Sequence, residues 1–471
     1  MLGVFLLIIN LFLNFNNGYC LSMQHKTVEI ISKKHGSEQR LFLDQHGINK
    51  NNALPKTLKS YSKEKSDLSK KKLRSIIFAT FLPAGYPEKT PSGYLPYVVY
   101  SFIQDFTTEL RSILATQKIL EGVGVGRTGA TALSATLNFI VRDGCGMIPS
   151  LLFTASLSSR FKGDIKRWRL FADIINDVGI TLEVAATLVP RQFFLLMICL
   201  GNMCKAMCGV AAYSSNGAIN MHWAKGSDIS DLQAKLNAQY TVSSVTGLFL
   251  AAFFAKSVSN LSQMTLWLLY SSLTIMHIYA NMRCMRLIEF DYFNTERLNI
   301  AITQFLNHMD KNVLSVDHEC IIDKPKAMAL KESLFFFPFN TKKTSTHTKI
   351  YNGVSFNELI QGSHMDVSNV EAILYRLSRQ GYIVVPCQGK ILVAFQEGIT
   401  KEKEAKAYFQ AVIMDRIIAR YPEEPLSVHF DLDAIETLWG VFETCARHAG
   451  WDLSRTELSK KGYEVSIIQK N

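Results

Sequence analysis

Apolar residues recur at helical spacing from Phe81 to Gly247, yet charged residues interrupt this pattern at regular points. Burying a charged group costs several kcal/mol unless it is paired or hydrated, so we expect partners or water for these side chains. From Tyr97 onward the spacing predicts one long helix with a continuous apolar stripe. The stripe consists of Val98, Phe102, Phe106, Leu110, Ile113, Leu114 and Ile119.

Glycine-rich runs divide the helical segment. Residues 122–129 end the first helix, and residues 144–149 form a second break after a helix over 130–142. Further helices are expected at 149–160, 163–187, 191–213 and 228–255.

The segment from Val242 to Tyr279 carries one charge, Lys256. Leu261–Ala280 is long enough to cross a bilayer, whereas 241–255 would cross only with distortion or as a hairpin partner. Residues 192–204 are apolar but too short. We therefore predict a mainly α protein with a membrane-embedded helical core, whose topology the sequence leaves open. A soluble bundle of unusually apolar helices is the alternative.

A different composition begins after Arg283 and predicts a separate C-terminal domain. Residues 298–317 are typical of a connecting helix, and 318–471 of a small soluble α+β domain. The strands 382–386 and 391–395 flank a turn and predict a hairpin. Amphipathic helices are expected around 401–420 and 432–449, and a returning strand at 463–468.

The N-terminal residues indicate targeting. Residues 1–20 are typical of a signal peptide or a signal anchor. Residues 21–75 hold 13 Lys/Arg against 5 Asp/Glu and predict a disordered basic leader. The net charge of +11 therefore belongs mainly to a tail, which argues against a nucleic-acid partner. The layout favours either a secondary plastid, through a bipartite leader, or a membrane of the secretory route.

The leader also carries clustered cations, Lys70–Lys72 and Arg74. Such a cluster can bind acidic lipid headgroups. A solvated targeting tail is the alternative.

Nine cysteines are scattered along the chain, and their odd number does not suggest a disulfide framework. Cys204 and Cys208 share a helix face, where they fit a packing seam better than a zinc site. Gly124, Gly126 and Gly129 match the dinucleotide fingerprint by letter but follow a predicted helix instead of a strand. We predict no metal site, and we favour a helix connection over nucleotide binding.

The segment 166–183 places polar residues three or four positions apart. They therefore share a helix face, where they form either ordinary ion pairs or the lining of a polar cavity. No catalytic set is predicted. The candidates for the polar cavity are Arg142, Asp143, Lys166, Arg169, Asp173, Asn176, Asp177, Glu183, His222 and Lys235.

An ordered series of short motifs in residues 76–297 resembles the root UVB-sensitive family. The series comprises Phe81-Leu82-Pro83, Gly85-Tyr86-Pro87, Leu114-Ala115-Thr116-Gln117, Gly124-Val125-Gly126, Arg142-Asp143-Gly144, Lys166-Arg167-Trp168-Arg169, Ala172-Asp173, Asn176-Asp177, Lys205, Gly209-Val210-Ala211, His222, Asp231-Leu232-Gln233-Ala234-Lys235, His277 and Asn281.

This resemblance implies a membrane protein connected with plastids, ultraviolet-B-sensitive root growth and vitamin B6 status, with no established reaction. It brings a link to pyridoxal phosphate by resemblance only, since the sequence shows no cofactor lysine. Three hypotheses follow: a carrier of a small polar metabolite, a non-catalytic membrane scaffold, and an enzyme of B6-related metabolism. We favour a protein without catalysis, with membrane lipids as partners and a homologous or other protein bound through 318–471.

Overall fold

The computed structural model describes most of the chain after residue 77 and one earlier hairpin. The described residues are 28–34, 37–43, 78–125, 132–157, 161–226, 228–258, 261–310, 322–336, 348–363, 374–375, 377–387, 389–422 and 431–466.

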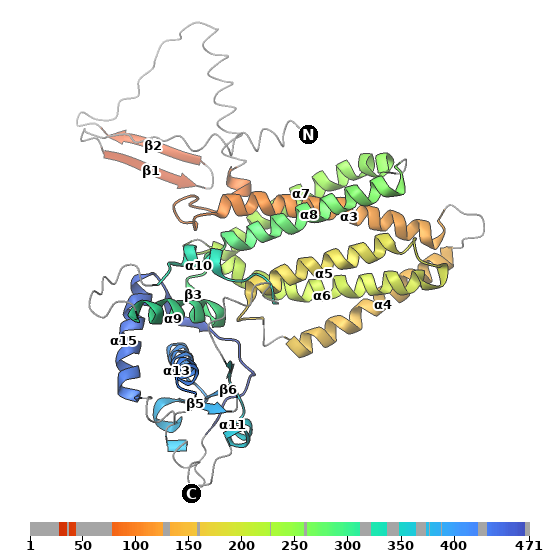
Figure 1. Ribbon diagram of the computed structural model, residues 1–471. Helices are drawn as coiled ribbons and strands as arrows, with labels where there is room; N and C mark the ends of the chain where they lie inside the picture. The colour runs from red at the N-terminus through yellow and green to blue at the C-terminus, as the bar shows by residue number, and fades with distance from the viewer. Residues whose placement is uncertain are drawn as a thin grey trace. The chain divides into compact units, whose positions relative to one another are not determined.

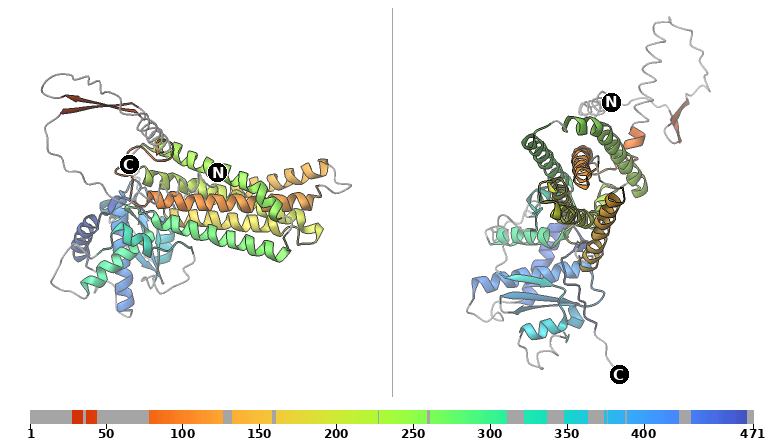
Figure 2. Two further views of the ribbon diagram at one scale, coloured as in Figure 1. Left: turned by 90° about the horizontal axis from the view of Figure 1, so that it is seen from above. Right: turned by 90° about the vertical axis from the view of Figure 1, so that its right-hand side faces the viewer.

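Six long helices, α3 to α8, form a bundle in which the helices run side by side (Figures 1 and 2). Helix α5 packs against α3, α6 and α8, α4 packs against α6, and α3 also packs against α7 and α8. The described residues between 94 and 287 are therefore mainly helical, as predicted. The helices are α3 (Tyr94–Val123), α4 (Ala132–Leu157), α5 (Ile165–Ala185), α6 (Arg191–Trp223), α7 (Ile229–Val258) and α8 (Gln263–Leu287).

Glycines set the close approach of neighbouring helices. A Cβ on Gly201 of α6 would lie 2.8 Å from the carbonyl oxygen of Gly179 on α5. A Cβ on Gly146 of α4 would lie 2.6 Å from Nδ2 of Asn202 on α6. The predicted break at 144–149 is wrong, because α4 continues through these glycines and through Pro149. Packing against α6 outweighs the local helix-breaking tendency of these residues.

Two of the described helices, α6 and α7, have the length and composition of membrane spans. Helix α8, which covers the predicted span Leu261–Ala280, does not meet the same criterion. The helix expected at 191–213 continues to Trp223 as α6. The prediction that the apolar run at 192–204 is too short to span is therefore wrong, because the helix that contains it has the length and composition of a span.

The C-terminal domain combines two small sheets with helices. Strand β4 (Lys349–Asn352) pairs in parallel with β6 (Lys390–Phe395), which pairs antiparallel with β5 (Tyr382–Cys387), so the predicted hairpin is confirmed. Strand β3 (Tyr292–Asn294) pairs in parallel with β7 (Asp452–Glu457). At the predicted strand 463–468 the described residues form only an isolated bridge, Gln396 to Val465. The remaining helices are α9 (Thr295–Met309), α10 (Pro325–Lys331), α11 (Phe356–Ser363), α13 (Lys401–Arg420) and α15 (Leu432–His448).

An aromatic core holds this domain together. Phe305 of α9 packs edge to face with Phe442 of α15, with ring centroids 5.5 Å apart. Phe293 of β3 stacks on Trp451 at 4.2 Å. Helix α9 therefore belongs to the C-terminal core and is more than the connecting helix expected at 298–317.

The N-terminal unit is described only at its hairpin. Strands β1 (Val28–Lys34) and β2 (Ser37–Leu43) pair antiparallel, with Val28 opposite Leu43. We expected no regular structure in 21–75, and β-branched residues such as Ile30 and Ile31 favour the strand that forms here instead. The predicted signal segment 1–20 and the rest of the leader lie outside the described residues.

Candidate functional site

Asp173, in the third turn of α5, accepts hydrogen bonds from donors on three helices. Nε2 of Gln104 on α3 donates to Oδ2 at 2.9 Å, and Nδ2 of Asn281 on α8 donates to the same oxygen. Nη1 of Arg169, one turn earlier on α5, donates to Oδ1 at 2.9 Å. The buried carboxylate is thus satisfied by one cation and two amides, as burial requires.

Asp177 lies one turn further along α5 and binds a second set of partners. Nη1 of Arg111 on α3 donates to Oδ1 at 2.6 Å, and Nδ1 of His277 on α8 lies 2.9 Å from Oδ2. The Arg111 side chain is 0% exposed and that of Asp177 5%. Thr274 places its hydroxyl 3.4 Å from the same guanidinium. Few soluble proteins bury an arginine completely, so this pair needs all of these contacts.

Glu183, near the end of α5, joins two further helices. Nη2 of Arg142 on α4 donates to Oε1 at 3.1 Å, and Nζ of Lys205 on α6 lies 2.6 Å from the same oxygen. Nδ2 of Asn202 donates to the Arg142 carbonyl oxygen at 3.0 Å. The close contact of α5 with α6 at Gly201 lets the lysine reach this carboxylate.

These three carboxylates follow one face of α5, and their partners come from α3, α4, α6 and α8. Four cationic side chains face the three carboxylates, so the charges are nearly balanced. We call this set the interior polar cluster. Its members are Gln104, Arg111, Arg142, Arg169, Asp173, Asp177, Glu183, Lys205, His277 and Asn281.

The outer faces of the same helices are apolar. Leu151 on α4 is 70% exposed, and Leu248 on α7 is 62% exposed. On α3 the most buried face contains Gln104, Thr107 and Arg111. The bundle therefore has polar groups inside and large apolar side chains outside. Other exposed apolar residues are Leu133, Leu137, Ile140, Met147, Ile148, Leu196, Phe249, Phe253, Met264, Leu268 and Ile275.

Half of the predicted candidates meet in the interior polar cluster. They are Arg142, Arg169, Asp173, Asp177 and Glu183.

The other half lie elsewhere. Asp143 is mostly exposed, with one oxygen 4.0 Å from Arg142. Asn176 is half-buried on the flank of α5. His222 packs on Trp223 and Phe290, and Lys235 lies 3.5 Å from Asp231 on its own helix. Lys166 belongs to a different network.

Several members of the interior polar cluster were not among the predicted candidates. Gln104 and Arg111 are seven residues apart on α3, hence on one face, and each interrupts an apolar stretch. This seven-residue spacing was the feature of the sequence that could have identified both residues as members of the cluster. Lys205, His277 and Asn281 entered only as part of the family resemblance, since nothing local in the sequence links them to α5.

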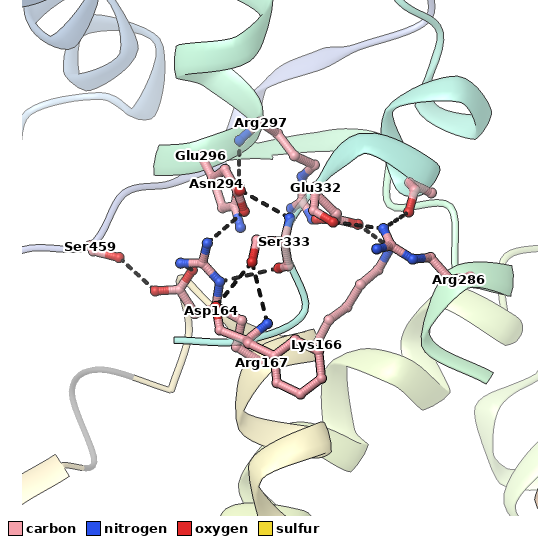
Figure 3. A network of polar contacts seen from close by, with 12 residues as sticks. Asp164, Lys166, Arg167, Arg286, Asn294, Glu296, Arg297, Glu332, Ser333 and Ser459 are labelled. Carbon is pink, nitrogen blue, oxygen red and sulfur yellow. Dashed lines mark hydrogen bonds and ion pairs between the residues drawn. The ribbon is translucent and has the colours of Figure 1, made fainter. Parts of the chain in front are cut away.

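Lys166 forms a second buried network, at the junction between the bundle and the C-terminal domain (Figure 3). Its ammonium pairs with Glu332, whose other oxygen accepts from Nη1 of Arg297 at 3.0 Å. Nη1 of Arg286 donates to the Glu332 carbonyl oxygen at 2.6 Å. Burial alone would raise the pKa of the Glu332 carboxyl, but Lys166 and Arg297 outweigh burial and hold that pKa below its usual value.

A second set of contacts extends this junction network. Nη2 of Arg167 donates to Glu296 at 2.7 Å, and the Ser333 amide donates to the other oxygen of Glu296 at 2.9 Å. The Ser459 hydroxyl donates to Asp164 at 3.1 Å. Burial raises the pKa of Glu296. The start of α5 is therefore fixed to the C-terminal domain by side chains on both sides.

Fold and site together define a helical-bundle protein with a charged interior, an apolar exterior and an attached α+β domain. Residues 67–309, just over half of the chain, match the family described as "Vitamin B6 photo-protection and homoeostasis domain". The chain belongs to this family, the root UVB-sensitive family.

Curated relatives agree with this assignment. The chain is 27% identical over 348 residues to "Protein root UVB sensitive 3" of Arabidopsis thaliana, covering 73% of this chain and 76% of the relative. It is 31% identical over 235 residues to "RUS family member 1" of Dictyostelium discoideum, covering 50% and 45%. It is 32% identical over 226 residues to "Protein root UVB sensitive 2, chloroplastic" of Arabidopsis thaliana, covering 48% and 51%. No solved structure matches the chain.

Proposed function

We propose that the α3–α8 bundle is embedded in a membrane and that its interior polar cluster binds and passes a small polar metabolite of vitamin B6 homoeostasis. The main support for this proposal is that the bundle has charged side chains inside and apolar side chains outside, the reverse of a protein that folds in water. Charged side chains such as Arg111 and Asp177 are buried, whereas Leu151 and Leu248 are exposed.

Solvent decides which distribution is stable. In water, a Leu side chain that stays exposed contributes about 1.5–3 kcal/mol less to folding than a buried one. This bundle exposes many such side chains, so in water the loss would be repeated for each of them. In lipid the same residues lie in a matching solvent, and charged residues face the bundle interior, where they typically mark a substrate or ion pathway. The exposed leucines and buried ion pairs of the bundle support the arrangement expected in lipid.

The chemistry of the cluster suggests the class of metabolite. Arg111, Arg142 and Lys205 offer donors suited to a phosphate or carboxylate, while Asp173 and Asp177 accept from hydroxyl or ammonium groups. In the described conformation these groups bind one another, so a substrate would replace internal pairs with its own. B6 vitamers carry such groups, and the description of the family supports testing them first.

Transport by purified protein tests the proposal. The full chain is reconstituted into liposomes, and uptake of radiolabelled pyridoxine, pyridoxal and pyridoxal 5′-phosphate is measured. We expect uptake of at least one vitamer, and its loss in Asp177→Asn. Lys118→Met, at an exposed ion pair on α3, should leave uptake unchanged and serves as the matched control. Absence of uptake for all three vitamers by correctly inserted protein would refute the carrier.

A membrane scaffold is the second candidate, and the junction network favours it. Buried pairs such as Lys166–Glu332 hold the C-terminal domain firmly to the bundle, as expected if that domain presents a surface to a partner protein. In a scaffold, Asp177→Asn acts only by weakening the fold. Complementation in cells at a temperature where the variant folds normally separates the candidates, because restored function supports the scaffold and persistent loss supports the carrier.

A further inference from the structure

A cavity of about 880 Å³ opens where the connection between α4 and α5 meets β4 and the segment after β7. Its volume falls within the range of small-molecule binding sites. The bundle contributes Phe153, Trp168 and Phe171, and the C-terminal domain contributes Phe336, Lys460 and Lys461. A ligand in this cavity would therefore contact both parts.

One wall of the cavity is aromatic. Trp168 stands edge to face with Phe336, with ring centroids 4.7 Å apart, and with Phe171 at 5.6 Å. Phe153 lies 6.1 Å from Trp168. Phe336 is 39% exposed, so this aromatic group leaves apolar surface uncovered beside the cavity. The wall suits an apolar ligand.

The opposite rim is polar and basic. Nζ of Lys460 lies 2.6 Å from Glu404, and Lys461 pairs with Glu358. Each ammonium has three donors, so one ion pair leaves further N–H groups for a ligand. Arg167, also on the lining, is already bound to Asp164 and Glu296. Each of the two lysines therefore has spare donors on this rim.

Asn352 adds a specific requirement. This residue is 3% exposed and lines the cavity, and its Oδ1 has no hydrogen-bond partner. Its Nδ2 donates to the Ser459 carbonyl oxygen at 3.4 Å. A buried acceptor without a partner costs about 1–3 kcal/mol. Because Oδ1 itself is buried, a ligand hydroxyl would relieve this cost once the Asn352 amide turns toward the cavity.

We propose that the cavity binds an anionic glycerophospholipid. Its acyl chain lies against the aromatic wall, its phosphate faces Lys460 and Lys461, and a headgroup hydroxyl donates to Oδ1 of Asn352 when that amide turns toward the cavity. The exposed residues Leu151 and Leu152 of α4 directly precede Phe153, so an apolar surface leads into the cavity. The proposal rests on membrane embedding of the bundle.

Quenching of Trp168 fluorescence by brominated lipids tests this site. The full chain is placed in phosphatidylcholine nanodiscs, and brominated phosphatidylglycerol or brominated phosphatidylcholine is added in steps. The Trp168 signal is the difference between the wild-type protein and Trp168→Phe. We expect half-maximal quenching at a several-fold lower mole fraction of the anionic lipid. Native mass spectrometry of the lipid retained by the wild-type protein gives a second readout that does not depend on the tryptophan variant.

Two lysine variants make the test specific. Lys461→Ala should reduce the preference for the anionic lipid on the order of five-fold, the effect of one lysine at a lipid headgroup. Lys331→Ala should leave the preference unchanged, because Lys331 is a solvated lysine of the same domain that is paired with Asp323 and lies outside the cavity.

Three results would overturn the lipid site: equal quenching by both lipids, an unchanged preference in Lys461→Ala, or displacement of the lipid signal by pyridoxal 5′-phosphate. The last result would assign the cavity to a soluble aromatic anion. Resistance of the wild-type protein to carbonate extraction measures membrane embedding separately. A protein that is embedded but shows no lipid preference loses only this inference.

Discussion

Replacing Arg111 with Met removes a fully buried guanidinium and keeps most of its apolar stem. The carboxylate of Asp177 then loses its contact with Arg111 at 2.6 Å and keeps the one with Nδ1 of His277 at 2.9 Å. Removing one partner of a buried ion pair typically costs about 3–5 kcal/mol, because the remaining charge is left uncompensated. We expect the free energy of unfolding of Arg111→Met to fall by about this amount.

Lys118→Met provides the comparison on the same helix. Lys118 pairs with Glu121 at 2.9 Å, but the glutamate side chain is 49% exposed. Exposed pairs contribute about 0–1 kcal/mol. Denaturant titration of both variants in the same detergent, followed by circular dichroism, measures the two losses directly.

A double-mutant cycle completes the experiment. Arg111→Met combined with Asp177→Asn removes both charges, so it should be more stable than the sum of the two single losses predicts, with a coupling of about 0.5–3 kcal/mol. If Arg111→Met is no less stable than Lys118→Met, or if the coupling is zero, the interior of this bundle is more hydrated than its geometry indicates and the reasoning fails.

Three further predictions concern packing, solvent and pH. Gly201→Ala should cost about 1–3 kcal/mol in unfolding free energy by overpacking, whereas Gly209→Ala on the same helix has open space and should be neutral or stabilising. If α7 faces lipid, Leu248→Lys should lower the membrane-bound fraction after carbonate extraction, because a lysine near the centre of a membrane helix costs about 2.5–3.5 kcal/mol of insertion free energy. Leu330 is equally exposed but lies in the C-terminal domain, so Leu330→Lys should leave that fraction unchanged. Identical behaviour of the two variants would contradict embedding. Folding lowers the pKa of the Glu332 carboxyl. The ionised carboxylate therefore contributes its full stabilisation at pH values above the pKa of an unfolded glutamate, about 4.3, and this stabilisation is lost as the pH falls through the lower pKa of the folded state. Unfolding free energy measured from pH 7 to pH 3 should show this loss, and Glu332→Gln should be less stable at pH 7 and lack that step.

The helical pattern of the sequence was sufficient for the type of most elements but not for the identity of the buried face. On α3 the apolar stripe predicted an interior containing Val98, Phe102 and Phe106, yet these residues are only half-buried, and Gln104 and Arg111 are buried instead. Apolar periodicity locates the interior only when the surrounding solvent is water. The same stripe does mark the interior further along α3, where Leu110, Leu114 and Ile119 are buried.

Spacing along α5 predicted the candidate site in part. Arg169, Asp173 and Asp177 recur every four residues and do share a face. Lys166 lies three residues before Arg169 but binds Glu332 of the C-terminal domain, 166 residues away. Spacing determines which side chains share a face, whereas the partner of each one depends on contacts between distant segments that no local pattern encodes.

The distance along the chain between interior partners constrains how this family can diverge. Arg111 and Asp177 lie 66 residues apart, on different helices. A lineage that loses one charge must lose or compensate the other in nearly the same step, because each intermediate leaves a buried ion alone. Positions 111 and 177 should therefore vary together across relatives, while the exposed apolar positions on α4 and α7 exchange freely among Leu, Ile, Val, Met and Phe.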